Sequence, residues 1–373
     1  MLRIKQGYVK YHRENLISLF QNFHLTSGGL QNIIIIMVTI SDIAKITGYS
    51  ATTVSRVLAQ NGGANREAEE RILLAARLTG YQSESFAIPS SSKPSRLIGV
   101  IVENESRQNE MEHPLFGGIL DSFRDHVSKR GYDILYLSKS FNSGMSYIED
   151  CRYRNVEGIL IANSIYDDPE VADLVASGIP CVSAAEFVPG ICTVVCENTL
   201  SSRRGVEYLI AHGHKEIGYI AGPYQVRSPA AIERGEGYKQ ALKAAGLTYD
   251  TKRIEKAEQW ELDSGYKAAQ KLFERCPNLT AVFCACDTLA VGAMQYLRKM
   301  GKRIPEDVSL VGFDDALISL CCHPSLTTFR QNREKIAYAC AQKLIEAISG
   351  NDEYEIVRVP VDFVERDSVA TVS

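Results

Sequence analysis

From Leu97 onward, short apolar runs rich in β-branched residues alternate with amphipathic stretches of helical length. This alternation constrains the fold more than any other feature of the sequence. Continuous apolar runs are typical of parallel strands buried on both faces, and the stretches between them are typical of crossover helices. The sequence therefore predicts an α/β body with doubly wound parallel sheets over residues 97–373. The predicted strands lie in Leu97–Val102, Asp133–Leu137, Gly158–Ala162, Glu216–Gly222, Ala281–Asp287 and Val308–Asp315.

The strands form two series, and the second begins after Val195–Asn198 with the sequence SSRRGVEYLIAHGHKEIGYIAG. We therefore expect two similar lobes that meet near this point. In open parallel sheets, ligands bind beyond the carboxyl ends of the strands. A cleft between the lobes is the expected site for a small molecule.

Residues 37–82, ahead of this body, have a different character. Apolar residues recur at helical spacing in ISDIAKIT and again in TVSRVL, and Gly48 interrupts the two runs. Ser50 can cap the second run by accepting a hydrogen bond from the amide of Thr52 or Thr53. Two short helices joined by a glycine-containing turn predict a helix-turn-helix. A third apolar stripe, expected to close a small core, consists of Ile72, Leu73, Ala76 and Leu78.

Residues 83–96 are rich in serine and contain Pro89 and Pro94, so they predict a linker between headpiece and body. The chain as a whole carries a net charge of −4, which says little about DNA binding when one small module does the binding. Its ten cysteines include no CxxC pair. They fit reduced thiols in a cytoplasmic core better than disulfides or a metal site. No apolar run is long enough to span a membrane.

Six motifs, in order, carry a resemblance to a known family: VTISDIAKITGYSATTVSRVL, GHKEIGYIAG, ERGEGYKQAL, CDTLAVGA, VGFDD and SLTTFRQ. Over nearly the whole chain after Met37, the sequence resembles the lactose-repressor/galactose-repressor family of bacterial transcriptional regulators. The resemblance implies a helix-turn-helix headpiece and a two-lobed body like that of periplasmic binding proteins. It also implies a homodimeric repressor of carbohydrate-utilisation genes that binds near-palindromic operator DNA and is controlled by a sugar. No cofactor is expected.

The second helix of the headpiece is the expected DNA-reading element, because such helices place their first residues at base edges in the major groove. Arg56 is the best candidate for a bidentate contact to guanine, although an isolated arginine is more often a solvated surface charge. Thr53 and Ser55 are expected at phosphates, and Ala51 can contact only a thymine methyl group. The predicted DNA-binding residues are Ser50, Ala51, Thr52, Thr53, Ser55 and Arg56.

The linker departs from the family, whose members form a hinge helix that inserts a leucine into the minor groove. Here that position falls at Ser90, directly after Pro89. Proline disfavours helix at Ile88, and serine cannot act as an apolar wedge. We therefore expect weaker DNA bending than in relatives. A gel-based bending assay that showed a sharp central kink would refute this expectation.

Sugars are held by polar groups on their hydroxyls and by an aromatic face on their apolar side. Arg234 and Asp287 are the polar groups expected at this site, followed by Asp314, which can instead cap the next turn. Trp260, the sole tryptophan, is expected to stack on the sugar, with a core position as the alternative. Phe116 is the candidate opposite wall or a plain core residue. The full predicted effector site is Phe116, Arg234, Trp260, Asp287, Asp314 and Gln331.

Two other functions are compatible with parts of the pattern. A solute-binding protein shares the two-lobed body, but it needs a secretion signal or lipid anchor and no helix-turn-helix. An α/β enzyme acting on sugars would need a nucleophile and a base, and no such spacing, Walker loop or GxSxG elbow occurs. His212 and His214 do not share a helix face, so no metal site is expected.

Residues 1–36 precede the point at which family members begin, and Met37 stands directly before VTISDIA. The segment lacks the ordered regions of a secretory signal. We expect that it results from an upstream start assignment, which an intact mass that includes these residues would refute. The carboxyl end contains no leucine heptads, so a two-fold dimer rather than a tetramer is expected.

Overall fold

The computed structural model describes residues 39–58, 65–79, 94–102, 114–137, 145–164, 168–223, 228–351 and 353–372. The chain divides into two compact units, with the boundary between Ala87 and Ile88. The expectations for residues 1–36, for most of the linker and for the wedge position at Ser90 lie outside the described residues.

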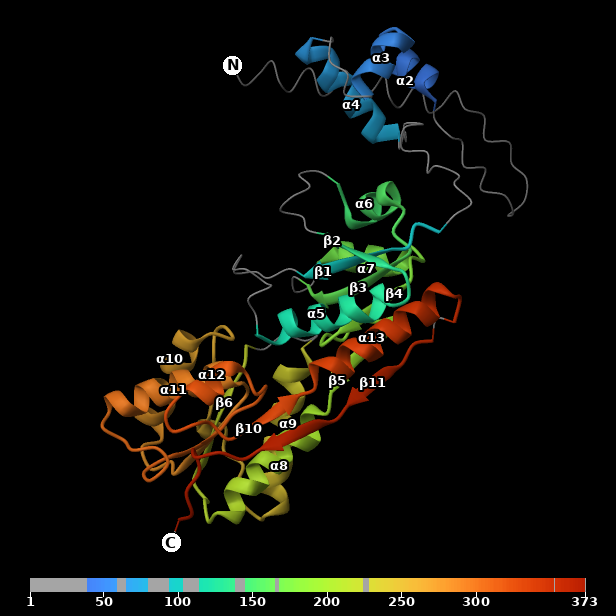
Figure 1. Ribbon diagram of the computed structural model, residues 1–373. Coiled ribbons are helices and arrows are strands. Elements are labelled where there is room, and N and C mark those ends of the chain that lie inside the picture. The colour runs from blue at the N-terminus through green and yellow to red at the C-terminus, as the bar shows by residue number, and fades with distance from the viewer. Residues whose placement is uncertain are drawn as a thin grey trace, which may run out of the picture. The chain divides into compact units, whose positions relative to one another are not determined.

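The described residues of the first unit form three helices, coloured blue in Figure 1. Thr39 and Asp42 form a reciprocal capping box at the start of the first helix. Gly48 ends that helix with φ +77°, a left-handed conformation that glycine adopts without strain. The Asn65 carboxamide accepts a hydrogen bond from the amide of Ala68 and caps the third helix. The helices are α2 (Ile40–Thr47), α3 (Ala51–Leu58) and α4 (Arg66–Thr79).

A small apolar core joins these helices. Ile72 and Ala76 of α4 are buried as predicted, but the prediction for Leu73 is wrong, because its side chain is 39% exposed. Ala75 is buried instead, since positions three and four residues apart share one helix face. The core consists of Ile43, Val54, Val57, Ile72, Ala75 and Ala76.

The described residues of the second unit form two parallel sheets, one in each lobe. The sheet of the first lobe has the order β11-β5-β4-β3-β1-β2, and all its neighbouring strands are parallel. Alternate residues face opposite sides, so Ile98 and Val100 pack against α5 and α13, whereas Ile101 packs against α6 and α7. Figure 1 shows α13 lying beside α5. The elements are β1 (Leu97–Val102), α5 (Pro114–Ser128), β2 (Asp133–Leu137), α6 (Tyr147–Arg154), β3 (Gly158–Asn163), α7 (Pro169–Ala176), β4 (Cys181–Ala184), β5 (Cys192–Cys196), α13 (Arg333–Ile348) and β11 (Ile356–Val359).

The sheet of the second lobe has the order β7-β6-β8-β9, again with parallel neighbours. Helix α8 packs against α9, and α10 packs against α11. The elements are α8 (Asn198–Ala211), β6 (Ile217–Ala221), α9 (Pro229–Ala244), the 3-10 helix η3 (Thr251–Arg253), β7 (Ile254–Lys256), α10 (Leu262–Arg275), β8 (Ala281–Cys284), α11 (Asp287–Lys299), β9 (Ser309–Val311), α12 (Leu317–Cys321), β10 (Thr328–Gln331) and β12 (Val361–Val364).

Three crossover segments join the lobes within the described residues. β5 continues into α8 at Cys196–Asn198, β10 into α13 at Gln331–Arg333, and β11 into β12 at Val359–Val361. β10 and β12 pair as an antiparallel ribbon. The first crossover coincides with the lobe boundary expected from the sequence. The predicted fold class, a helix-turn-helix headpiece followed by a two-lobed α/β body, is thus confirmed.

Candidate functional site

Helix α3 divides cleanly into a buried and an exposed face. Val54 and Val57 are buried in the headpiece core, whereas the exposed residues are Ala51, Thr52, Ser55 and Arg56. The same helix therefore holds the core together and presents the predicted base-reading side chains to solvent.

Ser50 holds the start of α3. Its hydroxyl accepts a hydrogen bond from the amide of Thr53 at 3.1 Å, and the hydroxyls of the two residues are 2.8 Å apart. Of the two amides that the sequence allowed for this cap, the structure selects that of Thr53. Thr53 is half-buried, and its hydroxyl retains capacity for one further hydrogen bond, as a phosphate contact needs.

Arg71 of α4 supports the turn from behind, a role that sequence reasoning missed. Its Nη2 donates to the carbonyl oxygen of Thr47 at 3.5 Å, and its guanidinium lies 5.6 Å from the centroid of the Tyr49 ring. The contacts fall on the last residue of α2 and on the turn that follows it, so they tie this turn to α4. No local spacing links Arg71 to residues 22 and 24 positions earlier.

The second candidate site lies at the carboxyl edge of the second-lobe sheet, with Arg234 of α9 at its centre. Arg234 is 3% exposed. Its Nε donates to Asn198 Oδ1 at 2.9 Å, and its Nη1 donates to the carbonyl oxygen of Ala285 at 2.5 Å and to Asp314 Oδ1 at 3.4 Å. The guanidinium lies 3.7 Å from the centroid of the Phe313 ring. None of these three hydrogen bonds uses Nη2, and the guanidinium also contacts the Cys196 side chain.

Arg234 remains charged in this setting. Burial lowers its pKa and the carboxylate of Asp314 raises it, and the net result is a pKa above the usual range. A buried, permanently charged guanidinium suits hydroxyl or carboxylate oxygens of a ligand.

Asp314 is held in an unusual backbone conformation beside Arg234. Its φ is +115°, and the next residue, Asp315, has φ +50°. Gln331 Nε2 donates to Asp314 Oδ1 at 2.6 Å, so the structure brings together Arg234, Asp314 and Gln331 from three separate motifs. Strained backbone of this kind is over-represented at ligand sites, which supports a role for Asp314 beyond capping the turn.

Asp287 does not join this group as a free polar side chain. It is 0% exposed, its Oδ1 accepts from the Thr328 hydroxyl at 2.5 Å, and its Oδ2 accepts from the amide of Ala316 at 2.8 Å. Burial and the nearby carboxylate of Asp314 raise its pKa well above the usual range. In this arrangement Asp287 connects α11 to the loop before α12 and to β10, and a ligand would have to displace one of those partners to reach it.

The two aromatic candidates lie in different lobes. Trp260 is half-buried, and its ring covers Gly222, where a Cβ atom would come within 2.0 Å of Cη2. Gly222 follows β6, so the indole lies at the carboxyl edge of the sheet and also packs against the lobe core. Phe116 of α5 is half-buried and packs against the core of the first lobe.

Sequence reasoning missed the polar residues on the crossovers. Asn198 stands at the first crossover and bonds Arg234, while Arg358 precedes the third crossover and pairs with Glu233 of α9. It also missed Ser164, which follows β3 and donates to Glu186 at 2.7 Å. These three residues each stand at a strand end or beside a motif named above, but their contacts become clear only from the fold.

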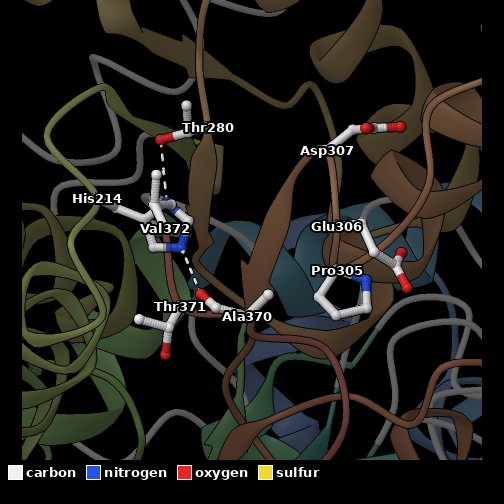
Figure 2. A pocket seen from close by; sticks show the side chains of 8 residues that line it. All are labelled: His214, Thr280, Pro305, Glu306, Asp307, Ala370, Thr371 and Val372. Carbon is white, nitrogen blue, oxygen red and sulfur yellow. Dashed lines mark hydrogen bonds between the residues drawn. The ribbon is translucent and has the colours of Figure 1, made fainter.

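A separate small pocket of about 200 Å³ lies in the second lobe. Figure 2 shows His214 at its wall, between the Thr280 hydroxyl at 3.0 Å from Nδ1 and the Ala370 carbonyl oxygen at 3.1 Å from Nε2. Both ring nitrogens are thus occupied within the fold. The lining residues are His214, Thr280, Pro305, Glu306, Asp307, Ala370, Thr371 and Val372.

Metal-ligand clusters and membrane-spanning helices are two features that the described part of the chain does not show. It contains no cluster of three or more histidine, cysteine or acidic side chains placed to hold a metal ion. None of its helices is both long and apolar enough to cross a membrane. Burial raises the pKa of Cys196 to about 11, as expected of an unreactive buried thiol.

Comparison with known proteins agrees with this arrangement. The model for bacterial regulatory proteins of the lacI family matches residues 39–84, and the model for a periplasmic binding protein-like domain matches residues 206–369. The transcriptional repressor PurR of Haemophilus influenzae (strain PittEE) is 30% identical over 347 residues, which cover 90% of this chain and 100% of that protein. The transcriptional regulator CelR of Thermobifida fusca is 30% identical over 322 residues, or 84% of this chain and 92% of that protein.

Solved structures extend the likeness to three dimensions. A complex of the transcriptional regulator CelR with cellobiose superposes with a TM-score of 0.65 at 28% identity, covering 88% of this chain and 99% of the other. The likeness therefore extends along nearly the whole length of these relatives. The chain belongs to the lacI family of bacterial DNA-binding transcriptional regulators.

Proposed function

We propose that this protein is a repressor of carbohydrate-utilisation genes, whose affinity for operator DNA changes when a sugar binds at the carboxyl edge of the second-lobe sheet. The observation that carries the proposal is Arg234, a buried and charged side chain whose Nη2 takes no part in its hydrogen bonds to Asn198, Ala285 and Asp314. Asp314 and Gln331 add an acceptor and a donor beside it. Trp260 supplies an aromatic face at the same sheet edge.

Such a set fits a polyol better than an apolar ligand, because each sugar hydroxyl needs both a donor and an acceptor. The similarity to a regulator solved with cellobiose supports the same ligand class. We assign direct roles to Arg234, Asp314, Gln331 and Trp260. Phe116 remains a proposed wall from the first lobe, and Asp287 acts by holding the loop that carries Asp314.

In the headpiece we propose that Arg56 reads a base, that Ala51 and Thr52 lie at the groove floor, and that Ser50, Thr53 and Ser55 bind phosphates. The module covers residues 37–82, followed by a linker over 83–96 and the body over 97–373. The protein acts in the cytoplasm as a homodimer. Because the two headpieces of such a dimer bind two symmetry-related half-sites, the operator is near-palindromic. Its linker, with Ser90 at the wedge position, bends that operator weakly.

Tryptophan fluorescence tests the effector site directly, because Trp260 is the sole tryptophan. Purified protein is titrated with a panel of mono- and disaccharides, and one of them is expected to produce a saturable change. Arg234→Ala should abolish this change. Arg275→Ala, which removes an arginine paired with Glu255 elsewhere in the same lobe, should preserve it. A flat response to every sugar would refute the sugar assignment.

A further inference from the structure

Two of the three crossovers between the lobes have a polar side chain that hydrogen-bonds to a residue of the effector site. From the first crossover, Asn198 accepts the Nε–H of Arg234. From the second, Gln331 donates to Asp314. The third crossover differs, because Arg358, which precedes it, contacts Glu233, the residue next to Arg234. The effector site and the crossover segments, which we call the hinge, are therefore joined by one network of hydrogen bonds.

The contact between Glu233 and Arg358 has the geometry of a strong ion pair. Nη1 of Arg358 donates to Oε2 and Nη2 donates to Oε1, both at 2.6 Å. The Glu233 side chain is 14% exposed and that of Arg358 is 33% exposed. The hydrogen bonds from Arg358 to Glu233 raise the arginine pKa above its usual range. Two parallel bonds fix the relative orientation of both groups, which a single contact does not.

This pair links the two lobes. Arg358 lies on β11, in register with Val195 of β5, and so belongs to the first-lobe sheet. Glu233 lies on α9, which packs against β6 of the second lobe. A change in the angle between the lobes must therefore stretch or break the pair, or carry α9 along with β11.

Glu233 also decides how Asn198 is oriented. Its Oε2 accepts a hydrogen bond from Asn198 Nδ2 at 3.2 Å. With Nδ2 held in this way, Oδ1 points to the other side, where it accepts from Arg234 Nε at 2.9 Å and from the Cys196 thiol at 3.1 Å. The reverse orientation would place an N–H donor against the Arg234 donor, which is unfavourable.

We propose that Glu233 and Arg358 form a latch between the lobes, which orients Arg234 through Asn198 and thereby sets the affinity for the effector. The proposal rests on the assignment of Arg234 to effector binding. Glu233 is a positioning residue, since it acts on the ligand only through Asn198 and Arg234. The alternative is that the ion pair contributes to stability alone.

The first test needs no effector. The Cys196 thiol is buried and donates to Asn198 at the hinge, so its rate of alkylation by N-ethylmaleimide reports on opening of this region. Arg358→Gln should raise that rate several-fold, measured by mass spectrometry of the Cys196 peptide. Cys340, buried in α13 of the first lobe, should react as slowly as before. Arg303→Gln, which breaks a bidentate pair with Asp307, is the matched control and should change neither rate.

If both thiols react faster in Arg358→Gln, the pair only stabilises the fold, and the latch is refuted. Unchanged labelling of Cys196 refutes it equally. The labelling experiment is independent of the proposed function, because the crossover segments between the lobes are present whether or not the protein binds a sugar.

The second test measures the effector dissociation constant by Trp260 fluorescence. Arg358→Gln should weaken binding by roughly 2- to 30-fold, a range typical of residues that modulate coupling without touching the ligand. Glu233→Ala should weaken it further, because it also releases Asn198. Adding Arg358→Gln to Glu233→Ala should change little more. Arg358→Lys, which keeps the charge without the paired geometry, should restore part of the affinity.

Dissociation constants within twofold of wild type in both single variants would overturn the proposal. Effects that simply add in the double variant would also overturn it. If no sugar changes the Trp260 fluorescence of the wild-type protein, the proposed function is refuted. The labelling of Cys196 then still decides whether the latch exists.

Discussion

Two buried ionisable residues of the second lobe show how context separates binding from structure. Arg234 and Asp287 are 3% and 0% exposed and look equally suited to a ligand in the sequence. Nη2 of Arg234 takes no part in the hydrogen bonds to Asn198, Ala285 and Asp314, whereas both oxygens of Asp287 are already bonded. The partner that distinguishes them is Thr328, which lies 41 positions after Asp287. A contact between residues so far apart cannot be predicted from their spacing in the sequence. The sequence could therefore identify Asp287 as a candidate but could not assign its role.

Arg56 carries a prediction about DNA reading. Arg56→Ala should lower operator affinity by about 1–3 kcal/mol, or roughly 5- to 150-fold, with relaxed preference at one base pair. Fluorescence anisotropy on an operator and its single-base variants measures this. Lys45→Ala removes another exposed positive charge from the headpiece and should weaken binding equally on all sequences. Equal weakening on all sequences by Arg56→Ala would show that Arg56 binds only phosphate.

His214 carries a prediction about pH. Burial, with a smaller contribution from His212, lowers its pKa in the folded state, so below about pH 6.5 the unfolded chain binds the proton more tightly. The stability that His214 contributes is therefore present above that pH and is lost as the pH falls. Urea unfolding at pH 7.5 and 5.5 should show this loss, and His214→Gln should reduce it. An identical pH dependence in that variant would contradict the account.

At the scale of elements, most strands of the body could be predicted from the sequence, but the ribbon of β10 and β12 could not. β1 and β2 have the predicted bounds, because continuous apolar runs buried on both faces are easily recognised. The run Ala281–Asp287 divides, since β8 ends at Cys284 and α11 begins at Asp287. The ribbon of β10 and β12 was missed because its strands are short and its pairing joins residues far apart in sequence.

The crossing of α10 and α11 shows why particular glycines are needed inside helices. A Cβ on Gly292 would lie 2.1 Å from the Leu262 carbonyl oxygen and 2.7 Å from the Tyr266 amide. Both are backbone atoms, so they cannot move aside as a flexible side chain can. The close approach of the two helices therefore requires a residue without a side chain at this point.

Gly292→Ala should consequently destabilise the protein by about 1–3 kcal/mol, the usual cost of overpacking. Gly235→Ala, in the middle of α9, meets only ordinary contact with Tyr219 at 3.5 Å. It should be neutral or stabilise by up to about 1 kcal/mol through helix propensity. Chemical denaturation of both variants measures the difference, and equal effects of the two substitutions would contradict the helix-crossing argument.

At the scale of the whole molecule, α12 offers a surface for a second copy of the chain. Leu317 and Leu320 are 73% and 60% exposed, and they stand three residues apart on one short helix, so they share one face. We expect this helix to lie in the interface of the proposed homodimer, which would place two headpieces on the two halves of a near-palindromic operator.

Leu320→Glu should therefore convert the dimer to a monomer in sedimentation velocity at micromolar concentration, because an unpaired carboxylate would be buried in the interface. Operator affinity should fall with it. Met300→Glu places the same charge at another site where a large apolar side chain is 59% exposed, and it should leave the dimer intact. A Leu320→Glu protein that remains dimeric would exclude α12 from the interface.

The central claim is that one ligand site controls one DNA site, and the most direct test is operator affinity measured as a function of effector concentration. For wild-type protein we expect the dissociation constant to change by roughly 5- to 150-fold. The change should saturate over the concentrations that saturate the Trp260 signal. Arg234→Ala should bind operator with one affinity at every effector concentration. An operator affinity that is constant in the wild type while Trp260 responds, or that changes equally in Arg234→Ala, would contradict the account.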